Sequence, residues 1–291
     1  GGEEMRKSRL ATVILACLLA VVPASGAMAQ GEPVGTAAFM DIGLGARAMG
    51  MGGAFVGVAD DATCVYYNPA GLAIQDGRNV TSFYTNQLGV AGYLGLAYAQ
   101  PKFGAAILSL RSSVQGTDEY ANPTEVYTVG ETALMASAAT TYRGLHLGGT
   151  VKYYSQSLPD LTGSGLTCDV GVLYQADGFS VGAVGRNLLG SVRYSNSTSD
   201  AFERTFAVGA AATLQENVTV AADYDTSGAF HLGGEYLLSP FALRAGAVFQ
   251  EGHMSFTAGL GFKYQMFQFD YAYQTHETLQ DMHRLSIGIK F

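Results

Sequence analysis

The feature that most constrains this chain is a series of short runs in which apolar and small polar residues alternate. Side chains of a β-strand point to opposite faces in turn, so a period of two predicts a strand with two different faces. About fourteen such runs, each of roughly ten residues, follow residue 78. They lie near 79–86, 92–100, 103–112, 132–142, 145–157, 165–175, 179–187, 205–214, 218–225, 230–238, 241–250, 255–264, 267–275 and 282–291. The fold is therefore predicted to be all-β.

The polar faces of these runs are small rather than charged. Charged residues make up 14% of the chain, whereas about 25% is usual for a soluble domain. Most polar positions hold Gly, Ala, Ser, Thr or Gln, which suit the lumen of a barrel, and the opposite apolar face suits lipid. About ten residues is also the length that a tilted strand needs to cross a bilayer. The pattern predicts a transmembrane antiparallel β-barrel of about fourteen strands.

The lengths of the connections between the predicted strands support this fold. Every second connection is very short, as at Pro101-Lys102, Arg143-Gly144 and Gln265-Met266. The intervening connections include the long stretches 113–131 and 188–204. Outer-membrane barrels have short turns on the periplasmic side and longer loops outside. The alternation predicts that both ends of the chain lie on the periplasmic side.

The beginning of the chain has the features of an export signal. A positively charged stretch at residues 6–9 precedes an apolar run at residues 10–22 that is too short to span a bilayer. Ala27-Met28-Ala29 then matches the small-x-small pattern of a cleavage site. Residues 5–29 are predicted to be a signal peptide, and Gln30 the first residue of the mature chain.

The end of the chain is an amphipathic strand with an aromatic last residue. Leu285, Ile287, Ile289 and Phe291 share one face of this strand. Together with an export signal, such an ending is typical of the closing strand and assembly signal of a bacterial outer-membrane barrel. The predicted location is the bacterial outer membrane, and the predicted partners are its lipid and the barrel-assembly machinery.

The segment at residues 30–77 does not alternate and contains two distinctive blocks. These are GARAMGMGGAFVGVADDAT at residues 45–63 and YYNPAGLA at residues 66–73. With their place ahead of the first strand, the strand number and Phe291, the blocks resemble the PorV/PorQ family, relatives of the FadL outer-membrane transporters. The resemblance implies a barrel at residues 78–291 and, at residues 30–77, the lumenal plug that is called a hatch in the FadL relatives.

Geometry supports the same organisation. Eight strands enclose an interior that side chains can fill, so a fourteen-stranded lumen is too wide to close without an insert. The small residues of 30–77 are suited to fill it. Asn68-Pro69-Ala70 is predicted to make a rigid turn that seats the plug, because proline restricts its own backbone and that of the preceding residue. Asp60 and Asp61 are expected to accept hydrogen bonds from plug amides or to pair with a basic residue: Arg47, Lys152, Lys263 or Arg244.

Two functions from different classes follow from these observations. The resemblance implies a non-enzymatic accessory protein for type IX-like secretion or surface attachment, which binds secreted cargo or a translocon subunit. The alternative is FadL-type passive transport of a hydrophobic small molecule past the hatch. The 13 basic and 22 acidic side chains after residue 29 give a net charge of −9, which disfavours nucleic acid. No catalytic set with a supporting sequence context is present, and neither a cofactor nor a metal is expected.

Three further groups of residues receive structural interpretations. A set of potential metal ligands in an outer connection is interpreted as a solvated loop: His276, Glu277, Asp281 and His283. Four tyrosines of the alternating runs are expected in interfacial aromatic belts: Tyr153, Tyr154, Tyr271 and Tyr273. Cys64 and Cys168 are interpreted as unpaired thiols, with a periplasmic disulfide as the alternative.

Overall fold

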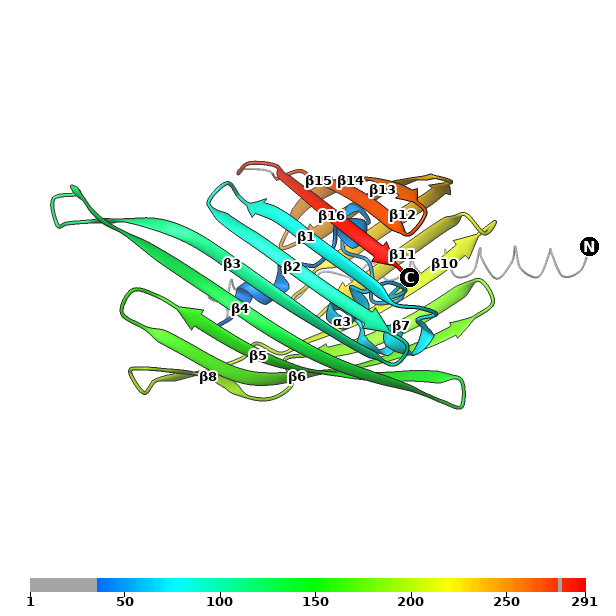
Figure 1. The fold of residues 1–291 in the computed structure, drawn as a ribbon, viewed down its shortest axis with the longest axis horizontal. Coiled ribbons are helices and arrows are strands. Elements are labelled where there is room, and N and C mark those ends of the chain that lie inside the picture. The colour runs from blue at the N-terminus through cyan, green and yellow to red at the C-terminus, as the bar shows by residue number, and fades with distance from the viewer. Residues whose placement is uncertain (1–35, 277–278) are drawn as a thin grey trace, which may run out of the picture. The chain divides into compact units, whose positions relative to one another are not determined.

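The computed structural model describes residues 36–276 and 279–291 (Figure 1). The predicted signal peptide, residues 30–35 of the predicted plug, and Glu277 lie outside the described residues. Among the residues that are described, no helix is both long enough and apolar enough to cross a membrane.

Fourteen antiparallel strands form a closed ring. β1 pairs with β16, and the pairing of β5 with β6 closes the circle. The strands are β1 (Asn79–Gln87), β2 (Ala91–Gln100), β3 (Phe103–Thr117), β4 (Pro123–Tyr142), β5 (Leu145–Ser157), β6 (Thr162–Ala176), β7 (Phe179–Arg186), β10 (Thr205–Leu214), β11 (Val218–Asp225), β12 (Phe230–Leu238), β13 (Phe241–Gln250), β14 (His253–Tyr264), β15 (Phe267–Gln274) and β16 (Met282–Lys290). The predicted all-β antiparallel barrel of about fourteen strands is confirmed.

The long connections contain more strand than the alternation predicts. β3 and β4 continue through most of 113–131 as a two-stranded ribbon that extends beyond the neighbouring strands (Figure 1). Another connection contains the hairpin of β8 (Ser191–Tyr194) and β9 (Ser199–Ala201), which pairs with β6. Both faces of the ribbon are exposed, so its side chains need not alternate in polarity, and a period-two criterion misses it.

The two faces of the ring differ as the alternation predicts. In β16, Leu285 and Ile287 are 55% and 50% exposed, while Arg284 and Ser286, which alternate with them, are buried. The same outward apolar pattern recurs around the ring, for example at Leu260 of β14. This outward surface is the one that suits lipid.

The N-terminal segment, defined here as described residues 36–77, lies inside the ring (Figure 1). It consists of short helical turns: η1 (Ala38–Asp41), α2 (Ala46–Gly50), α3 (Cys64–Tyr67) and η2 (Pro69–Ile74). Turn η2 packs against β4, β5 and β6, whereas α2 packs against β13, β14, β15 and β16 on the other side of the ring. The segment therefore bridges the interior from wall to wall.

Candidate functional site

Strand glycines allow the backbone of the N-terminal segment to touch the wall. A Cβ on Gly148 of β5 would lie 2.3 Å from the carbonyl carbon of Pro69, and one on Gly246 of β13 would lie 2.4 Å from the amide nitrogen of Gly52. No side chain fits at such distances, because real Cβ contacts do not come below about 3 Å. The Gly-rich inward face thus provides the contact surface for the segment.

The Asn68-Pro69-Ala70 turn forms one of these contacts. The Asn68 amide donates to the carbonyl oxygens of Val56 and of Val172 in β6, both at 3.0 Å. Its Oδ1 accepts from the amide of Ala70 at 3.2 Å, and Pro69 begins η2. Asn68 is fully buried. One side chain therefore joins two parts of the N-terminal segment to the wall.

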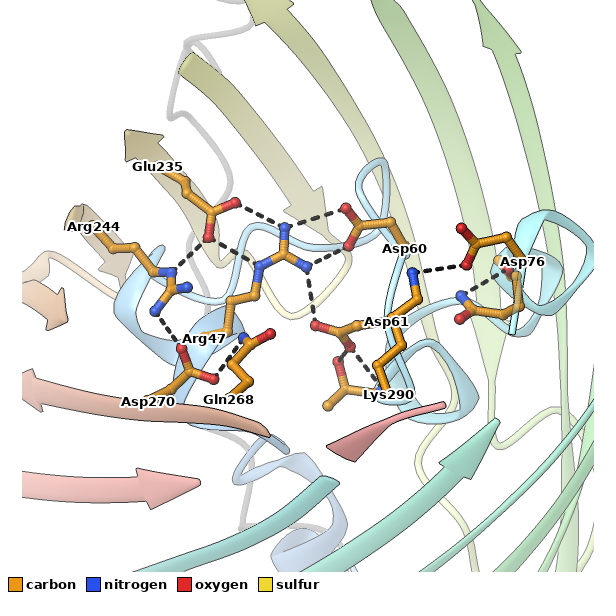
Figure 2. A network of polar contacts seen from close by, with 12 residues as sticks. Arg47, Asp60, Asp61, Asp76, Glu235, Arg244, Gln268, Asp270 and Lys290 are labelled. Atoms are coloured by element: carbon orange, nitrogen blue, oxygen red, sulfur yellow. Dashed lines mark hydrogen bonds and ion pairs between the residues drawn. The ribbon is translucent and has the colours of Figure 1, made fainter. Parts of the chain in front are cut away.

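An ionic network holds the opposite side of the segment (Figure 2). Arg47 of α2 donates to Glu235 of β12 through two nitrogens, at 2.8 and 3.0 Å. It also pairs with Asp60 at 2.5 Å and with Asp61 at 3.0 Å. Asp61 in turn accepts from the amide and hydroxyl of Thr63. Arg47 is thus the connection between α2, the Asp60-Asp61 turn and the wall.

The network continues along the wall through Arg244 and through three side chains that the sequence did not single out: Glu235, Gln268 and Asp270. Arg244 of β13 donates to Glu235 at 2.7 Å and to Asp270 of β15 at 2.8 Å, and Gln268 also donates to Asp270. Glu235 and Asp270 occupy inward positions of alternating strands, which was the available sequence signal. The buried guanidinium of Arg244 and the partly buried one of Arg47 lie between carboxylates and form a rigid assembly, because each charge-assisted bond fixes its neighbours.

The basic partners proposed for Asp60 and Asp61 are only partly the observed ones. Of the four candidates, Arg47 alone contacts these carboxylates. Lys152 pairs instead with Asp169 of β6 at 2.7 Å. Arg244 pairs with the wall carboxylates, and Lys263 is exposed at the short-turn end of the ring. Lys152 and Arg244 pair with carboxylates of neighbouring wall strands rather than with Asp60 or Asp61 of the segment.

A small polar pocket lies beside the network at the short-turn end of the ring. Its lining includes Arg47, Asp61, Lys263 and Gln268, and its volume is about 40 Å³. A buried water needs about 10–15 Å³, so this pocket holds roughly three waters. This pocket is too small for an organic ligand.

At the nearby rim, the hydrogen bond and charge of Lys290 lower the pKa of the exposed Asp76 carboxyl.

The interior toward the long-loop end is aromatic. Phe39 of η1 packs against Tyr93 and Tyr154, and Phe202 packs against Tyr154 at a ring-centroid distance of 6.0 Å. Phe83 joins the same cluster. The sequence predicts Tyr154 in an interfacial aromatic belt, and this prediction is wrong. Tyr154 is fully buried inside the ring. Its inward strand position and its bond to Glu131 at 2.7 Å account for the difference.

The other predicted residues lie apart from this interior. Leu285, Ile287 and Ile289 point out of the ring, while Phe291 exchanges two backbone hydrogen bonds with Arg78. In the 276–283 region, Asp281 accepts from Tyr273, and His283 bonds to Tyr271 at 2.6 Å. No group of metal-ligating side chains occurs in the part of the chain that is described. Cys64 and Cys168 are free thiols.

Comparisons with known proteins agree with this architecture. No family model matches the chain, and no curated protein matches it. Among solved structures, it is similar to the Pseudomonas putida toluene transporter TodX, with 14% identity and a TM-score of 0.62 over 86% of this chain and 99% of TodX. A deltaS2 mutant of TodX, described as a monoaromatic hydrocarbon channel, gives a TM-score of 0.57 over 84% and 96% of the two chains.

This likeness shows the fold. The chain shares the barrel fold of these two structures, which are a transporter and a channel. The comparisons support the barrel fold that the sequence predicts, and they do not extend to PorV/PorQ membership.

Proposed function

We propose that this protein is a passive channel of the bacterial outer membrane for small hydrophobic molecules. The observation that carries the proposal is the aromatic cluster inside the ring, formed by Phe39, Phe83, Tyr93, Tyr154 and Phe202. A pore for hydrophilic solutes has a polar, water-filled interior. An aromatic interior has few hydrogen-bonding groups for hydrophilic solutes. It favours apolar molecules, because their transfer from water to an apolar surrounding is favourable.

The likeness to TodX supports this proposal. TodX is a toluene transporter, and it shares the barrel fold over most of the length of both chains. The secretion-accessory function, with a cargo or translocon partner, rests on the sequence resemblance to the PorV/PorQ family and stays a prediction.

In this function, the N-terminal segment is the plug of the channel. Its wall-to-wall contacts and the ionic network around Arg47 and Glu235 close the short-turn end. A hydrophobic molecule that enters at the long-loop end reaches the aromatic cluster and stops at the plug. Passage then requires the plug or the wall beside it to move.

The test measures permeation of two solutes in vesicles with a lipopolysaccharide outer leaflet, because that leaflet hinders hydrophobic molecules. The intact chain should accelerate the entry of naphthalene, followed by its fluorescence, and should leave arabinose entry at the level of protein-free vesicles. Entry of arabinose without faster naphthalene entry would refute the proposal. Fractionation of the expressed chain should place it in the outer membrane, and recovery as a soluble periplasmic protein would exclude a channel.

A further inference from the structure

One buried cation inside the ring has no anionic partner. Arg284 of β16 is 2% exposed, yet its Nε and Nη1 atoms make no hydrogen bond. Its Nη2 atom has only the sulfur of Met282, at 3.5 Å. A thioether is a weak acceptor, so this contact compensates little of the cost of burying a guanidinium.

Other basic side chains of the interior have partners. Buried Lys152 and Arg244 each have a carboxylate within 2.8 Å, and partly buried Arg47 has three carboxylate partners. Partly buried Arg186 has no ion pair among the described residues, but it donates to the carbonyl oxygen of Tyr67 at 3.2 Å. No ion pair involves Arg284 among residues 36–276 and 279–291. A charged side chain at membrane depth is costly and usually marks a functional position. Both planar forks of a guanidinium use Nη2, together with either Nε or Nη1. A carboxylate in the place of the Met282 sulfur could therefore bind Nη2 and one of the two unbonded nitrogens at once.

The surroundings of Arg284 define what the rest of such a ligand would be. Its cross-strand partners are Thr85 of β1 and Ala272 of β15, and Thr85 pairs in turn with Tyr93 of β2. All three partners are fully buried. The Tyr93 ring packs edge-on against Phe83 at 5.8 Å and near Phe39 at 6.4 Å. The unpaired cation therefore adjoins the aromatic cluster.

Two neighbouring features make this place able to accept a ligand. The Tyr93 hydroxyl and the Oε1 atom of Gln87 in β1 are also buried without a hydrogen-bond partner. Met282 covers the Arg284 guanidinium with a flexible, unbranched side chain that can take up other positions at low cost. A carboxylate that displaced the Met282 sulfur would form charge-assisted hydrogen bonds in place of a weak contact.

We infer that Arg284 binds the carboxylate of a small aromatic acid whose ring lies against the Phe83–Tyr93 side of the aromatic cluster. The inference rests on the proposed channel function and specifies its ligand. It assigns to this chain an acidic aromatic ligand of the benzoate type, in preference to a neutral hydrocarbon of the same shape. The guanidinium provides the selectivity. A benzoate-type acid and the hydrocarbon that has a methyl group in place of the carboxylate have the same ring and differ mainly in charge.

The test uses benzoate and toluene, which present a carboxylate and a methyl group on the same ring. Binding of each to the refolded intact chain in detergent is measured by ligand-observed NMR. The wild-type chain should bind both, and benzoate more tightly. Arg284→Met should weaken benzoate binding about tenfold or more, since it removes hydrogen bonds to a charged group, and should change toluene binding less than about twofold.

Two further variants complete the design. Arg284→Lys keeps the charge without the planar fork and should give intermediate benzoate binding. Arg193→Met removes an arginine from β8, outside the ring, and should bind both ligands like the wild type. Heat-modifiable migration on gels verifies that each variant has assembled, and the wild-type comparison of the two ligands is informative even if Arg284→Met fails to assemble.

The outcomes separate this inference from the proposed function. Toluene binding without benzoate binding in the wild-type chain overturns the inference and leaves the channel function standing. Equal benzoate affinity in the wild type and Arg284→Met also overturns it. If the wild type binds neither compound, the proposed function itself fails for aromatic molecules, and the inference falls with it.

Discussion

Arg47 in the N-terminal segment and Glu235 in β12 are joined by two hydrogen bonds, from Nε to Oε2 at 3.0 Å and from Nη2 to Oε1 at 2.8 Å. The same Oε2 atom accepts from Arg244 at 2.7 Å. One carboxylate thus lies between two guanidinium groups, one from the segment and one from the wall. This arrangement makes Glu235 the charged attachment of the segment to β12, where His231 also bonds to the carbonyl oxygen of Gly52 at 2.7 Å.

Replacing this carboxylate should therefore loosen the segment. Glu235→Gln leaves two adjacent cations without their shared counter-charge, and we expect it to lower the free energy of unfolding by about 3–5 kcal/mol, as for other broken buried ion pairs. Urea unfolding of the refolded chain measures the loss. Asp60→Asn is the control, because Asp60 is about half exposed and should cost below about 1 kcal/mol. Equal effects of the two substitutions would contradict a special role for Glu235.

The glycine contact at Gly148 offers a second test of the same attachment. Gly148→Val places side-chain atoms where the backbone of Pro69 lies, so the segment should be displaced and ion conductance in planar bilayers should rise. Gly149→Val is the matched control, since a Cβ there meets only the Asp169 carbonyl oxygen, at 3.7 Å. Conductance that rises equally in both variants would show that the contact does not seat the segment.

Removal of the segment should open the ring. Fourteen strands enclose more space than their own side chains fill, so deletion of residues 36–70 should give a water-filled pore with clear single-channel conductance. The intact chain should conduct little. If the deletion and the intact chain conduct alike, the segment does not close the channel, and the proposed function loses its gate.

The thiol of Cys64 reports on the position of the segment. Cys64 is fully buried, and burial raises the pKa of its thiol, so it should stay protonated and unreactive. In a Cys168→Ser background, maleimide should label the native chain roughly a hundredfold more slowly than the urea-unfolded chain. Rapid labelling of the native chain would mean that the segment leaves its place often. Cys64→Ser in the same Cys168→Ser background gives the background labelling rate.

The outward face of β16 should be sensitive to charge. Ile287→Lys places a charge on a face that is expected to contact lipid, which costs about 2–4 kcal/mol near the middle of a membrane. We also expect deletion of Phe291 to leave exported but unassembled protein. Heat-modifiable gel migration measures the assembled fraction in both cases. A normal assembled yield after the deletion would show that the last aromatic residue is not an assembly signal.

The architecture was predictable because its determinants are local. The alternation of apolar and polar residues predicted the positions of all fourteen ring strands, and the residues that favour turns predicted the short connections between them. The β3–β4 ribbon was missed, because with both faces exposed it has no apolar side for a pattern to reveal. Asn68 and Arg47 could be singled out because each lies in one of the two distinctive N-terminal blocks, and such blocks can be recognised from a short stretch of sequence.

The sequence by itself therefore determined the number of strands, their two faces and the segment that precedes them. Only the tertiary structure decided which charges meet. Glu235 is 188 residues from Arg47, and Lys152 and Arg244, equally plausible partners in the sequence, are satisfied by wall carboxylates. The burial of Tyr154 and the unpaired state of Arg284 were likewise decided by packing. The physical reason is that alternation specifies which face a side chain takes, whereas register and ring closure determine which side chains share that interior.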